Sequence, residues 1–292
     1  MTKPCTPGEL ISLSPTLWRL TALNAGPMTG SGTNTYFFGC DAGVVVIDPG
    51  PNEARHREAI TKLAPAPVIG VAVTHTHRDH SPAAMPLAAS LGVPVFGMPP
   101  PATPENEHGF VPDTVLADGG TIFVPTLEPL RVVHTPGHAS NHLCYLTPDG
   151  VLITGDHVMQ GSTVVIMPPD GDMHDYLESL RRLLDLSLTA IAPGHGTLID
   201  DPKNEIIGIL QHRLARERKI ATALQSAQPC SIDTLVRLAY DDVPSLVWPL
   251  ARRSLEAHLV RLKRLGSVVQ SDVGWREEAA GTLEAIVKGD QQ

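Results

Sequence analysis

Four side chains that can bind metal ions stand within six residues in a His-x-His-x-Asp-His motif, made up of His75, His77, Asp79 and His80. The motif directly follows an apolar run, 68–74, that is typical of a buried strand. In an extended or loop backbone, His75 and His77 project to the same side and can share one metal. Asp79 and His80 come from the following turn, which displaces them enough to serve a second metal. Histidines clustered at a strand end indicate a metal site rather than an incidental polar loop.

Three further candidate ligands each follow an apolar stretch and stand next to a glycine: His138, Asp156 and His195. A glycine lets the backbone come close to a metal cluster without obstruction by a side chain. Ligands on loops at strand ends are what a site built on a rigid sheet requires. With the first motif, the set comprises five histidines and two aspartates, which suits a dinuclear site.

Short β-branched runs alternate with helical patterns in the first two thirds of the chain. The runs 143–147 and 151–154 flank a Pro-Asp-Gly turn and predict a hairpin. The stretch 44–48 predicts another buried strand, and helices are expected over 53–63, 83–91 and 173–186. Strands interspersed with helices predict an α/β layered architecture.

The tail of the chain has few strand signals and three helical patterns, over 203–226, 231–240 and 244–265. Ser231 is expected to cap the second helix, and Gly266 to end the third. A small hairpin near 268–275 would complete a winged-helix module. We therefore predict two domains, 1–201 and 202–292.

The ordered series of His-x-His-x-Asp-His, His, Asp and His resembles the metallo-β-lactamase superfamily. The segments 31–36 and 46–50 look like its opening strands, and 193–196 followed by 211–217 is similar to the lactamase-beta-2-like branch, which carries a C-terminal winged helix. The resemblance implies an αββα sandwich with two metals at one edge. It assigns the first metal to His75, His77 and His138, the second to Asp79, His80 and His195, and the bridge between them to Asp156. The true zinc β-lactamases of the first subclass place Cys at this bridge, so Asp156 argues against a dedicated antibiotic-resistance enzyme.

Two divalent cations in such a site would lower the pKa of a shared water from about 15.7 toward neutrality and so supply a hydroxide nucleophile. Asp79 is the candidate catalytic residue that receives the proton, and a role as ligand only stays open beside it. A nitrogen and oxygen ligand set without thiolates suits zinc, which we expect first, but also manganese or iron.

The predicted activity is therefore metal-dependent hydrolysis, with a phosphodiester, an ester or a thioester as substrate. The resemblance favours endoribonuclease activity on single-stranded RNA, and glyoxalase II-like hydrolysis of thioesters or lactones is the alternative. A non-catalytic winged-helix protein that binds nucleic acid is an alternative from another class. Iron-dependent oxygen chemistry on the same scaffold is a third alternative.

The remaining histidines receive smaller roles. We expect four of them to orient ligands or to be structural, with His157 as the one that reaches the pocket: His134, His142, His157 and His174. His212 and His258, in the helical tail, are expected to pack or to lie at the surface.

The 292 residues are 42% hydrophobic, which excludes a disordered chain. The net charge of −9 is uneven: residues 1–202 carry 9 Lys and Arg against 20 Asp and Glu, whereas 203–264 carry 11 against 6. A basic tail keeps contact with nucleic acid open, beside a solvated face or an oligomer contact. Four scattered cysteines and an N-terminus without a secretory pattern predict a cytoplasmic protein without a membrane partner; a homo-oligomer stays open.

Overall fold

The computed structural model describes residues 4–161 and 163–288, which form two β-sheets packed face to face, followed by a smaller C-terminal domain. The first sheet has seven strands in sequence order, with antiparallel pairing up to β4 and parallel pairing from there on. Its strands are β1 (Leu10–Ser14), β2 (Leu17–Thr21), β3 (Asn34–Cys40), β4 (Gly43–Ile47), β5 (Val68–Ala72), β6 (Val95–Gly97) and β7 (Thr114–Val115).

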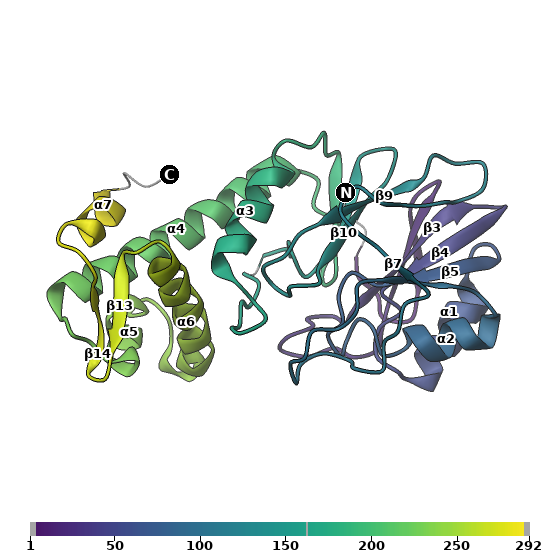
Figure 1. Ribbon diagram of the computed structural model, residues 1–292. Coiled ribbons are helices and arrows are strands. Elements are labelled where there is room, and N and C mark those ends of the chain that lie inside the picture. Colours follow the sequence, from purple (N-terminus) through teal and green to yellow (C-terminus); the bar gives the residue numbers. More distant parts are fainter. Residues whose placement is uncertain (1–3, 162, 289–292) are drawn as a thin grey trace.

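The second sheet has the order β12-β11-β10-β9-β8, and only β11 and β12 run parallel. Its strands are β8 (Thr121–Ile122), β9 (Leu130–His134), β10 (Leu143–Leu146), β11 (Val151–Gly155) and β12 (Ala190–Pro193). Helices α1 (Ala54–Leu63) and α2 (Ala84–Leu91) cover the outer face of the first sheet, and α3 (Met173–Leu183) covers that of the second (Figure 1). This is the predicted αββα sandwich.

Alternation of side chains along buried strands produces the layers. In β4, Val45 and Ile47 enter the core between the sheets, whereas Val44 and Val46 pack against α1 and α2. In β11, Ile153 faces the other sheet and Leu152 faces α3. Both faces of these strands are covered, which explains why they are continuous apolar runs in the sequence.

The C-terminal domain consists of α4 (Pro202–Ser226), α5 (Ile232–Ala239), η1 (Ser245–Val247), α6 (Trp248–Arg264), the hairpin of β13 (Val268–Ser271) and β14 (Gly274–Glu277), and α7 (Thr282–Lys288). The Ser231 side chain accepts a hydrogen bond from Thr234 N, and Gly266 adopts φ of 70° after α6, as the cap and stop signals predict. The three predicted helices and the small hairpin are confirmed. Helix α7 was not predicted, and residues 289–292 of the predicted domain lie outside the described residues.

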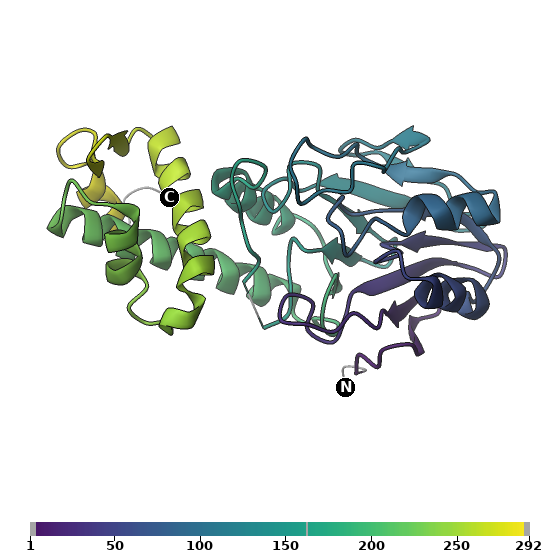
Figure 2. The ribbon, with the colours of Figure 1, turned by 90° about the horizontal axis from the view of Figure 1, so that it is seen from below.

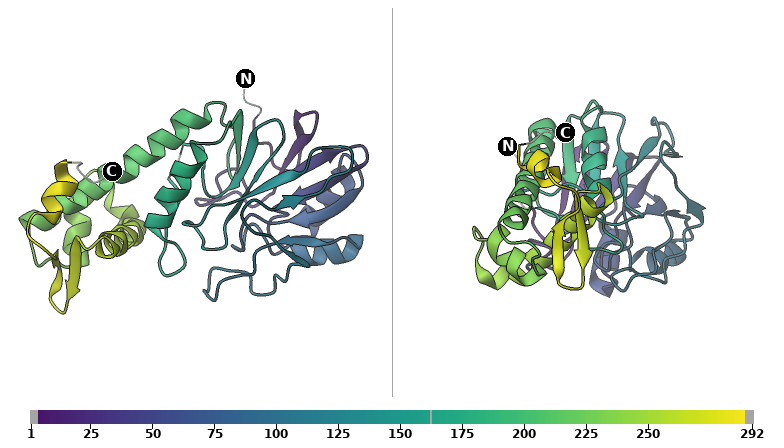
Figure 3. Two further views of the ribbon diagram at one scale, coloured as in Figure 1. Left: turned by 45° about the horizontal axis from the view of Figure 1, so that its top comes forward. Right: turned by 60° about the vertical axis from the view of Figure 1, so that its left-hand side comes forward.

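The long helix α4 belongs to both cores. Ile206 and Ile209 pack with α3 beneath the second sheet, whereas Ile220 and Leu224 pack in the C-terminal domain. Figures 1 and 3 show α4 running from the sandwich to that domain, and Figure 2 shows the domain at the end of the molecule away from α1 and α2. The predicted boundary at 201 lies at the start of this shared helix.

Many basic side chains of the tail are paired with acidic ones. Arg252 contacts Asp233 and Glu256, and Lys219 contacts Asp241 and Asp242. Further pairs join Arg216 to Asp242, Arg253 to Glu256, Arg261 to Glu217 and Arg264 to Asp175. These ion pairs hold six basic side chains, but every acidic partner except those of Arg264 belongs to the same segment, so the positive excess of 203–264 largely remains. None of the helices in the described residues combines the length and hydropathy that a membrane crossing requires.

Candidate metal centre

All seven predicted ligands lie at one edge of the sandwich, on loops from both sheets. The loop after β5 carries His75, His77, Asp79 and His80, and the loop between β9 and β10 carries His138. Asp156 follows β11, and His195 follows β12. A hydrogen bond of 2.8 Å from Asn34 N to Gly194 O ties the first sheet to the loop that bears His195. Strand ends from both sheets thus position side chains that are far apart in the sequence.

Three imidazole nitrogens form the first group. His77 Nδ1 lies 3.0 Å from His75 Nε2 and 3.0 Å from His138 Nε2. Tetrahedral ligands on one zinc ion, each about 2.0 Å from it, stand about 3.3 Å apart. The spacing of these three nitrogens is therefore suited to one ion.

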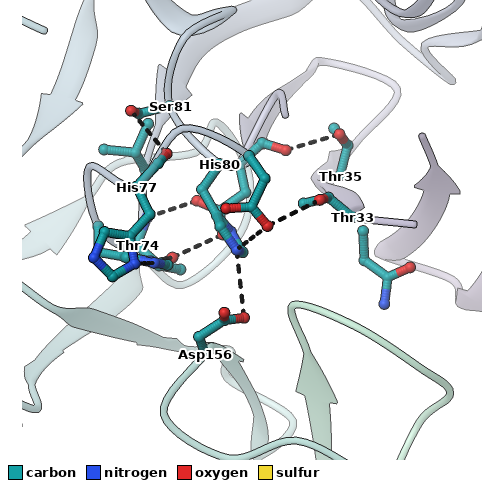
Figure 4. A network of polar contacts seen from close by, with 12 residues as sticks. Thr33, Thr35, Thr74, His77, His80, Ser81 and Asp156 are labelled. Atoms are coloured by element: carbon teal, nitrogen blue, oxygen red, sulfur yellow. Dashed lines mark hydrogen bonds and ion pairs between the residues drawn. The ribbon is translucent and has the colours of Figure 1, made fainter. Parts of the chain in front are cut away.

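The second group surrounds His80 Nε2, which lies 3.4 Å from Asp79 Oδ2. The same nitrogen lies 3.3 Å from Asp156 Oδ1 (Figure 4). His195 Nε2 lies 3.2 Å and 3.3 Å from the same two oxygens. The other oxygen of Asp156, Oδ2, lies 3.8 Å from His138 Nε2 in the first group. Asp156 therefore presents one oxygen to each group.

The donor atoms fit a pair of metal ions. His80 Nε2 and Asp156 Oδ1 are buried, and neither has a hydrogen-bond partner among the described residues. Gly194 leaves the space open, because a Cβ there would stand 2.6 Å from Asp156 Oδ1 and 2.8 Å from His80 Cε1. The ligand atoms form three overlapping groups, and within each group they lie within 4.8 Å of one another. The groups are His75, His77 and His138; His75, His80 and Asp156; and Asp79, His80 and His195.

Hydrogen bonds to the other ring nitrogen orient four of these histidines. His138 Nδ1 donates to Val165 O at 2.7 Å, and His195 Nδ1 lies 3.3 Å from Gly32 O. His80 Nδ1 donates to Asp48 Oδ2 at 2.8 Å. His75 Nδ1 lies 3.0 Å from the hydroxyl of Thr74, a residue that itself donates to Asp48. In the neutral form of each ring, Nε2 is therefore the nitrogen with the lone pair, and it faces the centre.

Asp48 is the functional residue that sequence reasoning missed. It follows β4 at φ of 52°, is 1% exposed, and accepts hydrogen bonds from Thr74 N at 2.6 Å and Thr74 Oγ1 at 2.7 Å as well as from His80. The signal in the sequence is an Asp at the end of a buried strand, within the segment 46–50 that resembles an opening strand of the family. Asp48 thus accepts directly from the ligand His80, and it orients the ligand His75 through Thr74.

We expect Asp48→Asn to lower metal affinity about 10- to 100-fold, because the amide is a weaker acceptor for His80 Nδ1. Competition with a chelator measures the change. Asp41→Asn, in the exposed turn after β3, is the matched control and should leave the affinity unchanged. Equal affinities in the Asp48 variant and wild type would contradict an orienting role.

Burial and neighbouring charges shift the pKa values of the histidines in the two groups in opposite directions. Burial, together with neighbouring imidazoles, lowers the pKa of His75, and it lowers that of His77 to about 3. Burial alone would also lower the pKa of His195, but the carboxylates of Asp156 and Asp79 raise it to about 9. The imidazoles of His80 and His195 overcome the effect of burial on Asp79 and hold its pKa below the ordinary range. The carboxylates are thus ionised and ready to bind cations.

The centre opens into a cavity of about 440 Å³. Five of the candidate ligands line it: His77, Asp79, His138, Asp156 and His195. Apolar side chains form much of its wall: Met28, Met159, Val164, Val165, Met167 and Leu250. Leu250 comes from α6, so the C-terminal domain contributes to the wall.

The prediction that His157 reaches the pocket is wrong. Its side chain is 0% exposed, and its ring lies edge-on to Tyr176, 5.0 Å away, so it is not among the residues that line the cavity. His142 is also buried, stacked 5.0 Å from His75 with its Nδ1 3.0 Å from Thr135 Oγ1. Both rings support the centre from behind.

The sequence matches the family described as the metallo-beta-lactamase superfamily over residues 28–195, which is more than half of the chain. The chain belongs to the metallo-β-lactamase superfamily. Residues 231–275 match the beta-lactamase associated winged helix domain. Both matches agree with the αββα sandwich and the helical tail described above.

Two curated relatives and one solved structure illustrate the similarity. The chain is 28% identical over 268 residues to a "Beta-lactamase-like protein 2 homolog" of Drosophila melanogaster, covering 88% of this chain and 90% of the relative. It is 31% identical over 229 residues to an "Atrochrysone carboxyl ACP thioesterase" of Aspergillus fumigatus, covering 75% and 68%. A beta-lactamase domain protein from Burkholderia ambifaria superposes with a TM-score of 0.77 at 22% identity, over 93% of this chain and 95% of that one. The last similarity concerns the fold alone.

Proposed function

We propose that this metallo-β-lactamase superfamily hydrolase acts on carboxylic thioesters and uses two divalent metal ions. His75, His77 and His138 would hold one ion, Asp79, His80 and His195 the other, and Asp156 would bridge them. The donor set suits zinc, with manganese or iron as alternatives.

The apolar wall beside the centre is the observation that carries this proposal. Met28, Met159, Met167 and Leu250 line the cavity together with the candidate ligands. An acyl chain bound there would bury apolar surface next to the reacting carbonyl. Arg78 is the one Lys or Arg among the described residues of the wall, whereas a polynucleotide requires several cations along its path.

Metal ions bound in this centre would lower the pKa of a water molecule and polarise the thioester carbonyl. Asp79 is suited to accept the proton of the attacking water, because its side chain is 31% exposed, against 13% for that of Asp156. Thr33 Oγ1 lies 3.4 Å from Asp79 Oδ2 and helps to orient it. Water adds to the carbonyl carbon, the carbon–sulfur bond breaks, and the thiol leaves with a proton.

The names of two relatives support the same substrate class. Besides the thioesterase reported above, this chain is 30% identical over 224 residues to a relative named "Thioesterase pkgB" from Emericella nidulans. Cleavage of single-stranded RNA, which the family resemblance favours, stays a prediction. Binding of RNA would depend on the basic side chains of residues 203–264, many of which form ion pairs with acidic side chains.

The deciding experiment incubates metal-loaded protein with acyl-pantetheine thioesters and, separately, with labelled single-stranded RNA. We expect thiol release from the thioesters, and a rate about 100-fold or more lower in Asp79→Asn, because the amide cannot accept a proton. A thiol-reactive dye measures the release.

The matched control is Asp185→Asn, an exposed position after α3, which should keep the wild-type rate. RNA cleavage that is lost in Asp79→Asn, without any thioester hydrolysis, would overturn the proposal in favour of the ribonuclease. Duplex DNA binding without hydrolysis of either substrate would instead support the non-catalytic alternative.

A further inference from the structure

Arg213 is a buried cation without an acidic partner. Its side chain extends from α4, and the residue is 4% exposed. One terminal nitrogen donates to Val164 O, the guanidinium carbon lies 5.5 Å from the centre of the Tyr176 ring, and Nε has no hydrogen-bond partner. No carboxylate among residues 4–161 and 163–288 forms an ion pair with Arg213.

The neighbouring acidic groups are already bound to other cations. Arg216 pairs with Asp242 at 2.8 Å, and Arg261 pairs with the buried Glu217. Arginine stays protonated at any pH at which a protein is folded. A buried guanidinium without a counter-charge is costly, so this position favours an anionic ligand.

Arg213 lines a second cavity, of about 220 Å³, at the junction of the sandwich and the C-terminal domain. The walls of this cavity include Arg216, His212 and Tyr240. It shares Val164, Val165 and Leu250 with the cavity of the metal centre, so the two spaces are neighbours. A substrate whose reacting carbonyl lies at the metal centre could thus extend past Leu250 toward Arg213.

We propose that the cavity lined by Arg213 binds an anionic group of the substrate, a carboxylate or a phosphate, while the intervening apolar part lies on Val164, Val165 and Leu250. The inference rests on the proposed thioester hydrolysis. The two sources of the anion differ: a carboxylate would end the acyl chain, whereas a phosphate would belong to the thiol that leaves.

One loop connects Arg213 to the metal centre and must be separated from this role. Val164 O accepts from Arg213, and the next carbonyl, Val165 O, accepts from the ligand His138 at 2.7 Å. Loss of Arg213 can therefore slow the enzyme on every substrate by moving His138. Loss of anion recognition, by contrast, slows hydrolysis only of substrates that carry an anion.

The test compares kcat/KM of wild type, Arg213→Met and Arg213→Lys on three kinds of thioester. Acetyl-pantetheine carries no anion, acetyl-phosphopantetheine carries a phosphate on the thiol, and succinyl-, glutaryl-, adipyl- and suberyl-pantetheine carry a carboxylate on acyl chains of rising length. We expect Arg213→Met to lower kcat/KM on one of the two anionic kinds of thioester about 10- to 100-fold more than on acetyl-pantetheine. This is the size of effect that loss of a charged hydrogen bond produces. Arg213→Lys should restore part of the preference for the anionic thioester. Arg218→Met, which changes an exposed residue on the same helix, should keep the wild-type preference.

A second readout does not depend on hydrolysis. The free dicarboxylates and phosphopantetheine should raise the melting temperature of the metal-loaded wild type more than that of Arg213→Met, whereas pantetheine should act on both alike. This result without any hydrolysis would refute the thioesterase proposal and keep the anion site. Equal losses on anionic and neutral thioesters, with equal stabilisation by the anions, would overturn the anion site and leave Arg213 as a support for the loop of His138.

Discussion

Asp156→Ala is expected to abolish turnover, with a loss of at least about 1000-fold in kcat. The side chain offers Oδ1 to His80 and His195, each at 3.3 Å, and Oδ2 to His138 at 3.8 Å. Alanine removes the one carboxylate shared by both candidate metal groups. It also leaves His80 Nε2 buried without that carboxylate beside it. We therefore expect bound metal to fall from two ions per chain toward one or none, as elemental analysis of dialysed protein would show.

The matched control for this change is Asp185→Ala, at an exposed position after α3. It should keep both ions and full activity. Asp156→Asn keeps the shape of the side chain but not its charge, so it separates loss of the bridging charge from the creation of a cavity. Full metal content and normal turnover in Asp156→Ala would refute the assignment of Asp156 as the bridge between two ions.

The second large effect concerns stability and lies outside the metal centre. Glu217→Ala should lower the free energy of unfolding by about 3–5 kcal/mol, because it leaves buried partners without their carboxylate. Glu217 is 4% exposed, accepts from His258 Nδ1 at 3.1 Å, and pairs with Arg261. Urea unfolding of metal-loaded protein measures the change. Glu178→Ala, which removes an exposed pair with Arg181, should cost about 1 kcal/mol or less.

The pKa of Glu217 predicts how the stability of the fold depends on pH. Burial alone would raise the pKa of Glu217, but the hydrogen bond from His258 and the charge of Arg261 lower it overall. A carboxyl whose pKa is lower in the folded state stabilises the fold above its unfolded pKa of about 4.3. That contribution disappears as the pH falls through the lower folded value. Wild type should therefore lose more stability than Glu217→Gln in this acidic range, and parallel pH profiles would contradict the assignment.

Local patterns in the sequence predicted most of the elements. The apolar run 68–74 ends in β5, the Pro-Asp-Gly turn joins β10 to β11, and Ser231 caps α5 as expected. These features depend on side chains that are neighbours along the chain, so alternation and capping reveal them. Helix α7 was missed because its short sequence carries a weak amphipathic pattern, and packing against α4 supplies its stability.

The sequence by itself determined which side chains can bind metal, because the His-x-His-x-Asp-His motif places donor atoms on one strand end and glycines mark the later ligands. Tertiary structure alone decided the rest. It placed Asp48 behind His80 and kept His157 out of the cavity. It also brought Leu250 of α6 into the wall of the metal-centre cavity and Arg213 of α4 into the wall of the neighbouring cavity. These contacts join residues from separate elements, so they depend on how the sheets and helices pack and leave no periodic signal in the chain.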